Sequence, residues 1–94
     1  MTSTKCQQGV ILMFTNKAGD GSNNVCGKQI ALFRKQMGKS QRELADALQL
    51  LGLDVDKNAI QRIEAGKRFV TDIELVYLAK VLNVSYEELL SQQI

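Results

Sequence analysis

From about residue 25 onward, apolar residues recur at helical spacing, and residues that start or stop helices separate the apolar stretches. Ile30, Phe33 and Met37 are spaced three and four positions apart, which places them on one face of a helix. Gly38 follows directly, and glycine is common just past a helix C-terminus. The pattern predicts a first helix that begins near residue 25 and stops at Gly38.

The second predicted helix begins with a capping box at residues 40–43, Ser-Gln-Arg-Glu. In such a box the Ser hydroxyl accepts from the third helical N–H, and the Glu side chain accepts from the Ser N–H. We expect this helix to end near Leu51, with Gly52 as its C-terminal cap. Its expected core positions are Leu44, Ala45 and Leu48.

A third helix start is indicated by Asp56, a favoured N-cap residue. Val55 before it and Ile60 after it have the spacing of a hydrophobic staple. The helix is expected to run to Ala65 and to end at Gly66.

Two further capping boxes, at residues 71–74 and 85–88, predict a fourth and a fifth helix. The fourth helix has an apolar face with the spacing i, i+3, i+4, i+7, formed by Leu75, Leu78, Ala79 and Leu82. The fifth is short and is expected to end near Leu90. Together the patterns predict an all-α fold of five helices.

Residues 1–24 have a different character, because they mix polar residues with three glycines. Their one apolar run, residues 10–14, has the length of a strand but no partner strand in view. We therefore divide the chain into a flexible N-terminal arm, residues 1–24, and one helical domain, residues 25–94.

The apolar run at residues 10–14 is also too short to cross a bilayer, and no convincing secretory signal accompanies it. We expect a cytoplasmic protein with no membrane association. In that compartment the two cysteines, Cys6 and Cys26, are expected to be reduced.

Composition narrows the chemistry further. The 94 residues suit one small domain, and 45% hydrophobic with 23% charged residues is ordinary for a globular protein. Histidine is absent, and two cysteines alone cannot fill a tetrahedral zinc site. No nucleophile and base have a spacing that suits catalysis. We expect no enzymatic activity, no metal and no cofactor.

Charge is divided unevenly along the chain. Residues 28–68 hold nine Lys and Arg against five Asp and Glu, a net of +4, whereas residues 69–94 have a net of −3. A basic middle segment suits a surface that binds a polyanion. The alternative is that these charges are ordinary solvated helix faces.

Residues 27–91 resemble the Cro/repressor type of helix-turn-helix domain, which is the lambda-repressor-like or XRE class. The order of helices and connections matches this class, and so do particular residues spread over all five helices. The matching positions are Arg34, Gly38, residues 40–45, Ile60, residues 63–68, 78–79, 82–85 and 88–90. The resemblance implies a compact five-helix, lambda-repressor-like DNA-binding domain.

The function that the resemblance implies is sequence-specific binding of double-stranded DNA by a small prokaryotic or phage-type transcriptional regulator. One such domain contacts one half-site, so a homodimer on a palindromic operator is the geometric expectation. Candidates for the dimer contact are Tyr77, Tyr86, Ile94 and residues 10–14. The alternative is an antitoxin-like or adaptor protein that acts mainly through a protein partner.

The third predicted helix is the candidate for reading bases. At 100° per residue, Ile60 and Ile63 point to one side, and polar residues point to the other. Asn can pair with adenine, and Arg or Lys with guanine. The resemblance also assigns base contacts to several of these positions. The expected base-reading residues are Lys57, Asn58, Gln61 and Arg62.

Four other residues are candidates for binding phosphates. Gln41 lies at the start of the second helix, where free N–H groups favour an anion, and Arg42 follows it. Lys67 and Arg68 follow the glycine that ends the third helix. The alternative is ordinary solvation of all four side chains.

By resemblance, Arg34 and Glu64 form an internal ion pair that links the first helix to the end of the third. Their expected role is structural.

The sequence departs from the common pattern of this class at two places. Six residues separate Leu48 from Val55, where many relatives have a single glycine. We expect an added turn on the second helix, with Leu50, Leu51 or Leu53 filling the edge of the core. Lys39 stands where relatives usually have an apolar residue.

Overall fold

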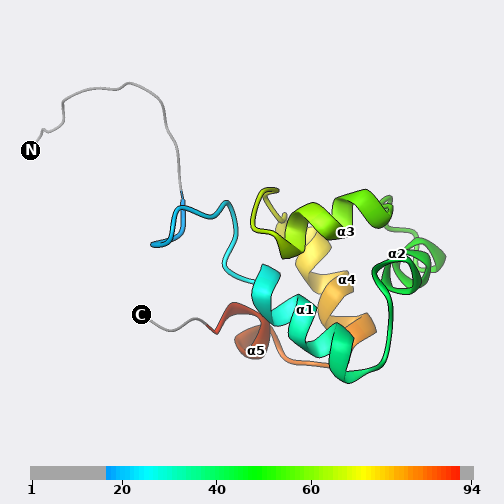
Figure 1. Cartoon of the computed structure of the whole chain (residues 1–94). Helices are drawn as coiled ribbons and strands as arrows, with labels where there is room; N and C mark the ends of the chain where they lie inside the picture. Colours follow the sequence, from blue (N-terminus) through cyan, green and yellow to red (C-terminus); the bar gives the residue numbers. More distant parts are fainter. Residues whose placement is uncertain (1–16, 92–94) are drawn as a thin grey trace, which may run out of the picture.

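The structure, a computed structural model, describes residues 17–91, and within that range the chain forms five α-helices and no strand (Figure 1). The all-α, five-helix fold predicted from the sequence is confirmed. None of the helices in this range is long and apolar enough to span a bilayer. The helices are α1 (Gly27–Gln36), α2 (Gln41–Leu50), α3 (Lys57–Glu64), α4 (Asp72–Leu82) and α5 (Tyr86–Leu90).

Four of the five helices begin where the sequence predicted a side-chain cap. The three capping boxes are complete, with N-caps Ser40, Thr71 and Ser85. Asp56 caps α3, because its carboxylate accepts the N–H of Ala59 at 2.8 Å. These bonds satisfy N–H groups that have no partner inside the helix. The helix boundaries therefore follow from local sequence.

The end of α3 matters most for the site described below. Gly66 has a φ of +76°, a conformation that side chains with a Cβ rarely adopt. This lets the N–H of Lys67 donate to the carbonyl of Arg62 at 2.9 Å, while the N–H of Gly66 donates to that of Ile63 at 3.0 Å. The two bonds form a Schellman motif, which stops the helix and turns the chain sharply.

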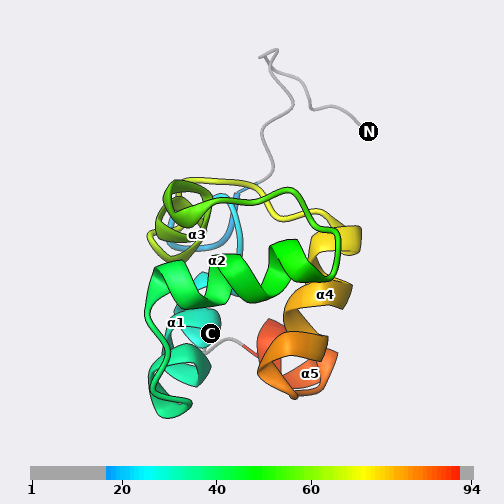
Figure 2. The same ribbon diagram turned by 90° about the vertical axis from the view of Figure 1, so that its right-hand side faces the viewer.

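One hydrophobic core joins all five helices. Its largest fully buried side chains are Ile30, Leu44, Leu48, Ile60, Ile63, Leu78 and Leu89. α1 contacts α3, α4 and α5, and α2 contacts α3 and α4 (Figure 2). Met37, expected on the apolar face of the first helix, is 43% exposed because α1 ends at Gln36 and Met37 is its C-cap.

The long connection between α2 and α3 is partly helical, as expected, because α2 continues to Leu50 and the chain turns at Gly52, whose φ is +99°. Of the three leucines that could fill the edge of the core, Leu53 packs against it, whereas Leu50 is 88% exposed. The amide of Gln49 donates to the carbonyl of Val55 at 2.6 Å. This bond ties the end of α2 to the segment that enters α3.

Asn23 and Asn24 lie in the segment that the sequence assigned to the arm, but they hydrogen-bond to residues 63–68 of the helical domain. Residues 10–14, Cys6 and Ile94 lie outside the described residues. Cys26 is a free, buried cysteine, and burial raises the pKa of its thiol.

Candidate nucleic-acid interface

α3 exposes one polar face and buries one apolar face. Ile60 and Ile63 are 0% and 1% exposed, so the apolar side of the helix is closed into the core. The other face is open to solvent and carries the four expected base-reading side chains: Lys57, Asn58, Gln61 and Arg62. An exposed helix of this kind is the usual element that enters the major groove of DNA.

The start of α3 lies beside α2. An open recess of about 440 Å³ between the two helices is lined by Arg42 from α2 and by Lys57 and Asn58 from α3. Asp46 and Asp56 line the same recess, and the carboxylate of Asp56 is already bound at the helix start. The structure thus brings a candidate phosphate-binding residue next to two candidate base-reading residues.

The end of α3 is fixed to α1 and α2 through Glu64. One carboxylate oxygen, Oε2, lies 2.7 Å from Nε of Arg34 on α1, and the other, Oε1, lies 3.0 Å from its Nη2. Oε1 also accepts the side-chain amide of Gln41, the first residue of α2, at 2.9 Å. A single carboxylate therefore connects three helices.

The Arg34–Glu64 ion pair, which the resemblance suggested, is largely removed from water. Its side chains are 10% and 8% exposed. Nη1 of Arg34 donates to the carbonyl of Lys39 at 2.8 Å, so the guanidinium also holds the turn between α1 and α2. The hydrogen bond to Glu64 raises the pKa of Arg34, which keeps this side chain charged.

Gln41 was expected to contact a phosphate, and the structure shows that its side-chain amide is turned toward Glu64. The backbone at this position keeps the property on which the expectation rested. The first N–H groups of α2, those of Gln41 and Arg42, have no carbonyl one turn earlier inside the helix. Arg42 itself is exposed.

The two basic residues after α3 differ in their surroundings. Lys67 is exposed. Arg68 forms a two-pronged ion pair with Glu74 on α4, with both Nη–Oε distances at 2.9 Å, and Nη1 also donates to the carbonyl of Phe69. These bonds use three of the five N–H groups of the guanidinium.

The ion pair shifts the acidity of both partners. The hydrogen bond from Arg68, followed by those from Thr71, lowers the pKa of Glu74, and Glu74 raises the pKa of Arg68. Glu74 is recognisable in the sequence only as the last residue of a capping box. Its second role was missed because Arg68 lies on a loop, where no periodic spacing predicts which side chain it meets.

Comparison with known proteins shows which family this arrangement of helices belongs to. The helix-turn-helix family model matches residues 30–89, well over half of the chain. No curated protein sequence matches the chain significantly. Solved structures do match, and regulators from two bacteria are among them.

The restriction-modification controller protein C.AhdI from Aeromonas hydrophila is similar to this chain, with 27% sequence identity and a TM-score of 0.59. The match covers 67% of this chain and 88% of that protein. The clp gene regulator ClgR from Corynebacterium glutamicum has 25% identity and a TM-score of 0.63, over 72% of this chain and 67% of that one. A second ClgR structure gives a TM-score of 0.62.

The family match covers the capped α2, the exposed α3 and the Arg34–Glu64 pair that holds them. The chain therefore belongs to the helix-turn-helix family, in its Cro/repressor-type (XRE) class of DNA-binding proteins.

Proposed function

We propose that this protein binds double-stranded DNA at specific sequences and regulates transcription, as a small prokaryotic or phage-type regulator in the cytoplasm. The observation that carries the proposal is the placement of α3. Its polar face is exposed, while its apolar face and its last residue, Glu64, are fixed to the rest of the domain. A helix held in this way keeps one orientation relative to the domain, so its polar side chains can enter the major groove in a constant geometry.

In this proposal α3 reads bases. Asn58 has the donor and the acceptor needed to pair with adenine, and Arg62 can donate two hydrogen bonds to guanine. Lys57 and Gln61 extend the same exposed surface. Each good bidentate contact discriminates against the wrong base by about 1–3 kcal/mol.

The phosphate contacts in this proposal flank α3. Lys67 binds as a mobile point charge, since its side chain is exposed. Arg68 uses the N–H groups that Glu74 and the carbonyl of Phe69 leave available. On the other side, Arg42 and the first backbone N–H groups of α2 approach the opposite backbone of the groove.

The regulators with similar structures support the regulatory part of the proposal. C.AhdI is a controller of restriction and modification, and ClgR is a regulator of clp genes. We propose that this chain, too, acts by binding and performs no chemistry.

We further propose that the protein acts as a homodimer on a palindromic operator, because one domain covers only a half-site. Exposed apolar side chains are available for such a contact. Ile73 and Val76 lie three residues apart on α4 and are 64% and 44% exposed, and Tyr86 on α5 is 50% exposed. Tyr77 is half-buried against the core.

The same exposed side chains favour a second candidate function, in which the domain binds another protein as an antitoxin-like or adaptor module. Phe69, at 57% exposure, is a further exposed apolar side chain. The dependence of binding on salt concentration distinguishes the two functions. DNA binding through several phosphates weakens steeply with salt, whereas an apolar protein contact does not.

The experiment is selection from a pool of random DNA duplexes at about 50 and 200 mM salt, followed by sequencing of the bound fraction. Recovery of one palindromic motif, with binding that weakens steeply at the higher salt, supports the proposal. Weak binding without an enriched motif at the lower salt would exclude sequence-specific DNA recognition and favour the protein-interaction function.

A further inference from the structure

Asn24, just before α1, makes three hydrogen bonds, which go to the start of α1, the last turn of α3 and the loop after α3. Its Nδ2 donates to the carbonyl of Ile63 at 3.1 Å and to the carbonyl of Arg68 at 2.7 Å. Its Oδ1 accepts the N–H of Gly27, the first residue of α1, at 2.8 Å. One partly buried side chain therefore fixes the start of α1, the last turn of α3 and the loop that follows α3.

Asn23 holds the same loop from the next position. Its backbone N–H donates to the carbonyl of Gly66 at 2.8 Å, and its Nδ2 donates to the carbonyl of Lys67 at 3.1 Å. Together, Asn23 and Asn24, which we name the asparagine clasp, bind the carbonyls of Ile63, Gly66, Lys67 and Arg68.

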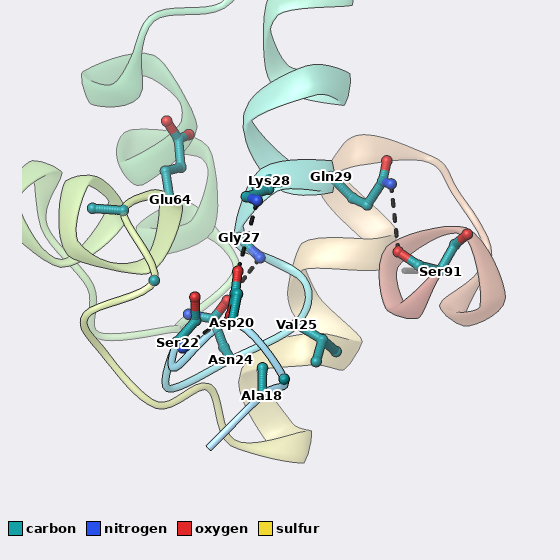
Figure 3. A pocket seen from close by; sticks show the side chains of 13 residues that line it. Ala18, Asp20, Ser22, Asn24, Val25, Gly27, Lys28, Gln29, Glu64 and Ser91 are labelled. Atoms are coloured by element: carbon teal, nitrogen blue, oxygen red, sulfur yellow. Dashed lines mark hydrogen bonds and ion pairs between the residues drawn. The ribbon is translucent and has the colours of Figure 1, made fainter. Parts of the chain in front are cut away.

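Asn24 forms part of the wall of an open recess between the residues before α1, the start of α1 and the end of α3 (Figure 3). In Figure 3, Asn24 lies directly beneath Gly27. A Cβ at Gly27 would overlap the carbonyl of Ile63, so the backbones of α1 and α3 meet here without space for a side chain. The end of α3 is thus held both by the clasp and by Glu64, which binds Arg34 and Gln41.

We infer that the asparagine clasp positions the loop after α3, residues 66–68, for binding DNA phosphates. This inference rests on the proposed function. Lys67 and Arg68 are the basic residues of this loop, and the clasp bonds to the backbone carbonyls of both. Because its bonds to this loop go to the backbone, the clasp fixes where the side chains of Lys67 and Arg68 begin and makes no bond to their charged groups.

The test compares two clasp variants with the wild-type protein on the selected operator. Asn24→Asp keeps an acceptor for the N–H of Gly27 but loses the donor that Ile63 and Arg68 use. Asn23→Ala is the neutral, milder variant, because it loses side-chain bonds to the carbonyl of Lys67 and from the ammonium of Lys17 but keeps the backbone bond to Gly66. Gln29→Ala is the matched control, since it removes a side-chain bond to a different carbonyl, that of Ser91.

Two readouts separate positioning from a merely structural role. The first is the slope of binding affinity against salt, measured at a temperature where each variant is fully folded. The second is amide hydrogen exchange at Gly66 and Lys67 without DNA, because both N–H groups close the turn that the clasp holds.

We expect both clasp variants to bind the operator more weakly, Asn24→Asp by about tenfold. We also expect the slope of log affinity against log salt concentration to fall by about the amount that one phosphate contact contributes. Adding Lys67→Ala to either variant then reduces affinity by less than it does in the wild type, since the contact is already impaired. Exchange at Gly66 and Lys67 accelerates in both variants, while Gln29→Ala keeps the wild-type affinity, slope and exchange.

Unchanged slopes in folded clasp variants, with a wild-type protein that binds its operator, would overturn the positioning role and leave the proposed function intact. Unchanged amide exchange in Asn24→Asp would overturn it without any reference to DNA. A wild-type protein that binds no DNA would instead remove the proposed function, and with it any role of the clasp in DNA binding.

Discussion

Nε of Arg34 lies 2.7 Å from Oε2 of Glu64, and this contact joins α1 to the last residue of α3 across 30 positions of sequence. The pair is largely buried, and the same carboxylate receives Gln41 from α2. Desolvation offsets much of the attraction in a buried ion pair, so we propose that this pair serves mainly to orient the helices it joins. In this domain the oriented element is the helix that we propose to read DNA.

Removing one partner leaves the other charged and buried. Arg34→Ala should therefore lower the free energy of unfolding by about 3–5 kcal/mol, which denaturant or thermal unfolding measures. In the double variant Arg34→Met with Glu64→Leu no charge is stranded, so we expect it to lose less than the two single variants together. An Arg34→Ala protein that unfolds like the wild type but no longer binds DNA would show that Arg34 contacts DNA instead.

Replacing Gly27 by alanine should destabilise the domain, whereas the same replacement elsewhere in a helix is usually stabilising. Replacing glycine by alanine in a helix normally stabilises it by about 0.5–1 kcal/mol. At Gly27 the added Cβ would overlap the carbonyl of Ile63, so we expect Gly27→Ala to be destabilising by about 1–3 kcal/mol. Gly19→Ala is the control, because a Cβ there meets open space. A higher melting temperature for Gly27→Ala would contradict the close approach of α1 and α3.

Alanine substitutions at Lys67 and Arg68 should differ in their effects on stability. Lys67→Ala is expected to leave the melting temperature unchanged and to reduce the salt slope of DNA binding by about one phosphate. Arg68→Ala also breaks the ion pair with Glu74, so it should cost about 1–3 kcal/mol of stability, between the values for exposed and buried pairs. Equal stability losses in the two variants, measured by thermal unfolding, would refute this division of roles.

Low pH should reduce the free energy of unfolding of the domain, in part because Glu74 becomes protonated. Its pKa is lowered from 4.5 by the bond from Arg68, so it binds protons more weakly when folded than when unfolded. Its contribution to stability is therefore complete above the unfolded value and disappears as pH falls through the folded one. Glu74→Gln should be less stable than the wild type at pH 7, and the difference should shrink toward about pH 3 when both are unfolded by urea. A difference independent of pH would contradict the lowered pKa.

The helices were predictable from sequence because their signals are local. Each of four helices is capped by a side chain that bonds to the residue three positions later; the caps are Ser40, Asp56, Thr71 and Ser85. The glycines that end helices directly follow the C-cap residues. Position within the core was less predictable. Leu50, Leu51 and Leu53 have equal hydrophobicity, and only the path of the chain after α2 decides that Leu53 packs inward.

Contacts between side chains and distant backbone could not be predicted. Asn24 lies in a stretch whose composition indicates a loop, yet its partners are 39 and 44 residues away. The bond from Arg68 to Glu74 likewise has no periodic trace. The Arg34–Glu64 pair was suggested only by resemblance to a family, since its 30-residue separation indicates no contact by itself.

The central claim is that α3 reads bases, and selection of DNA by variants of α3 tests it most directly. Asn58→Ala and Arg62→Ala would be put through the same random-duplex selection as the wild type, with Lys80→Ala on α4 as an exposed control. We expect each α3 variant to lose its preference at one position of each half-site, by about 1–3 kcal/mol, and to keep the rest of the motif. Recovery of the unchanged wild-type motif by both α3 variants would contradict the claim.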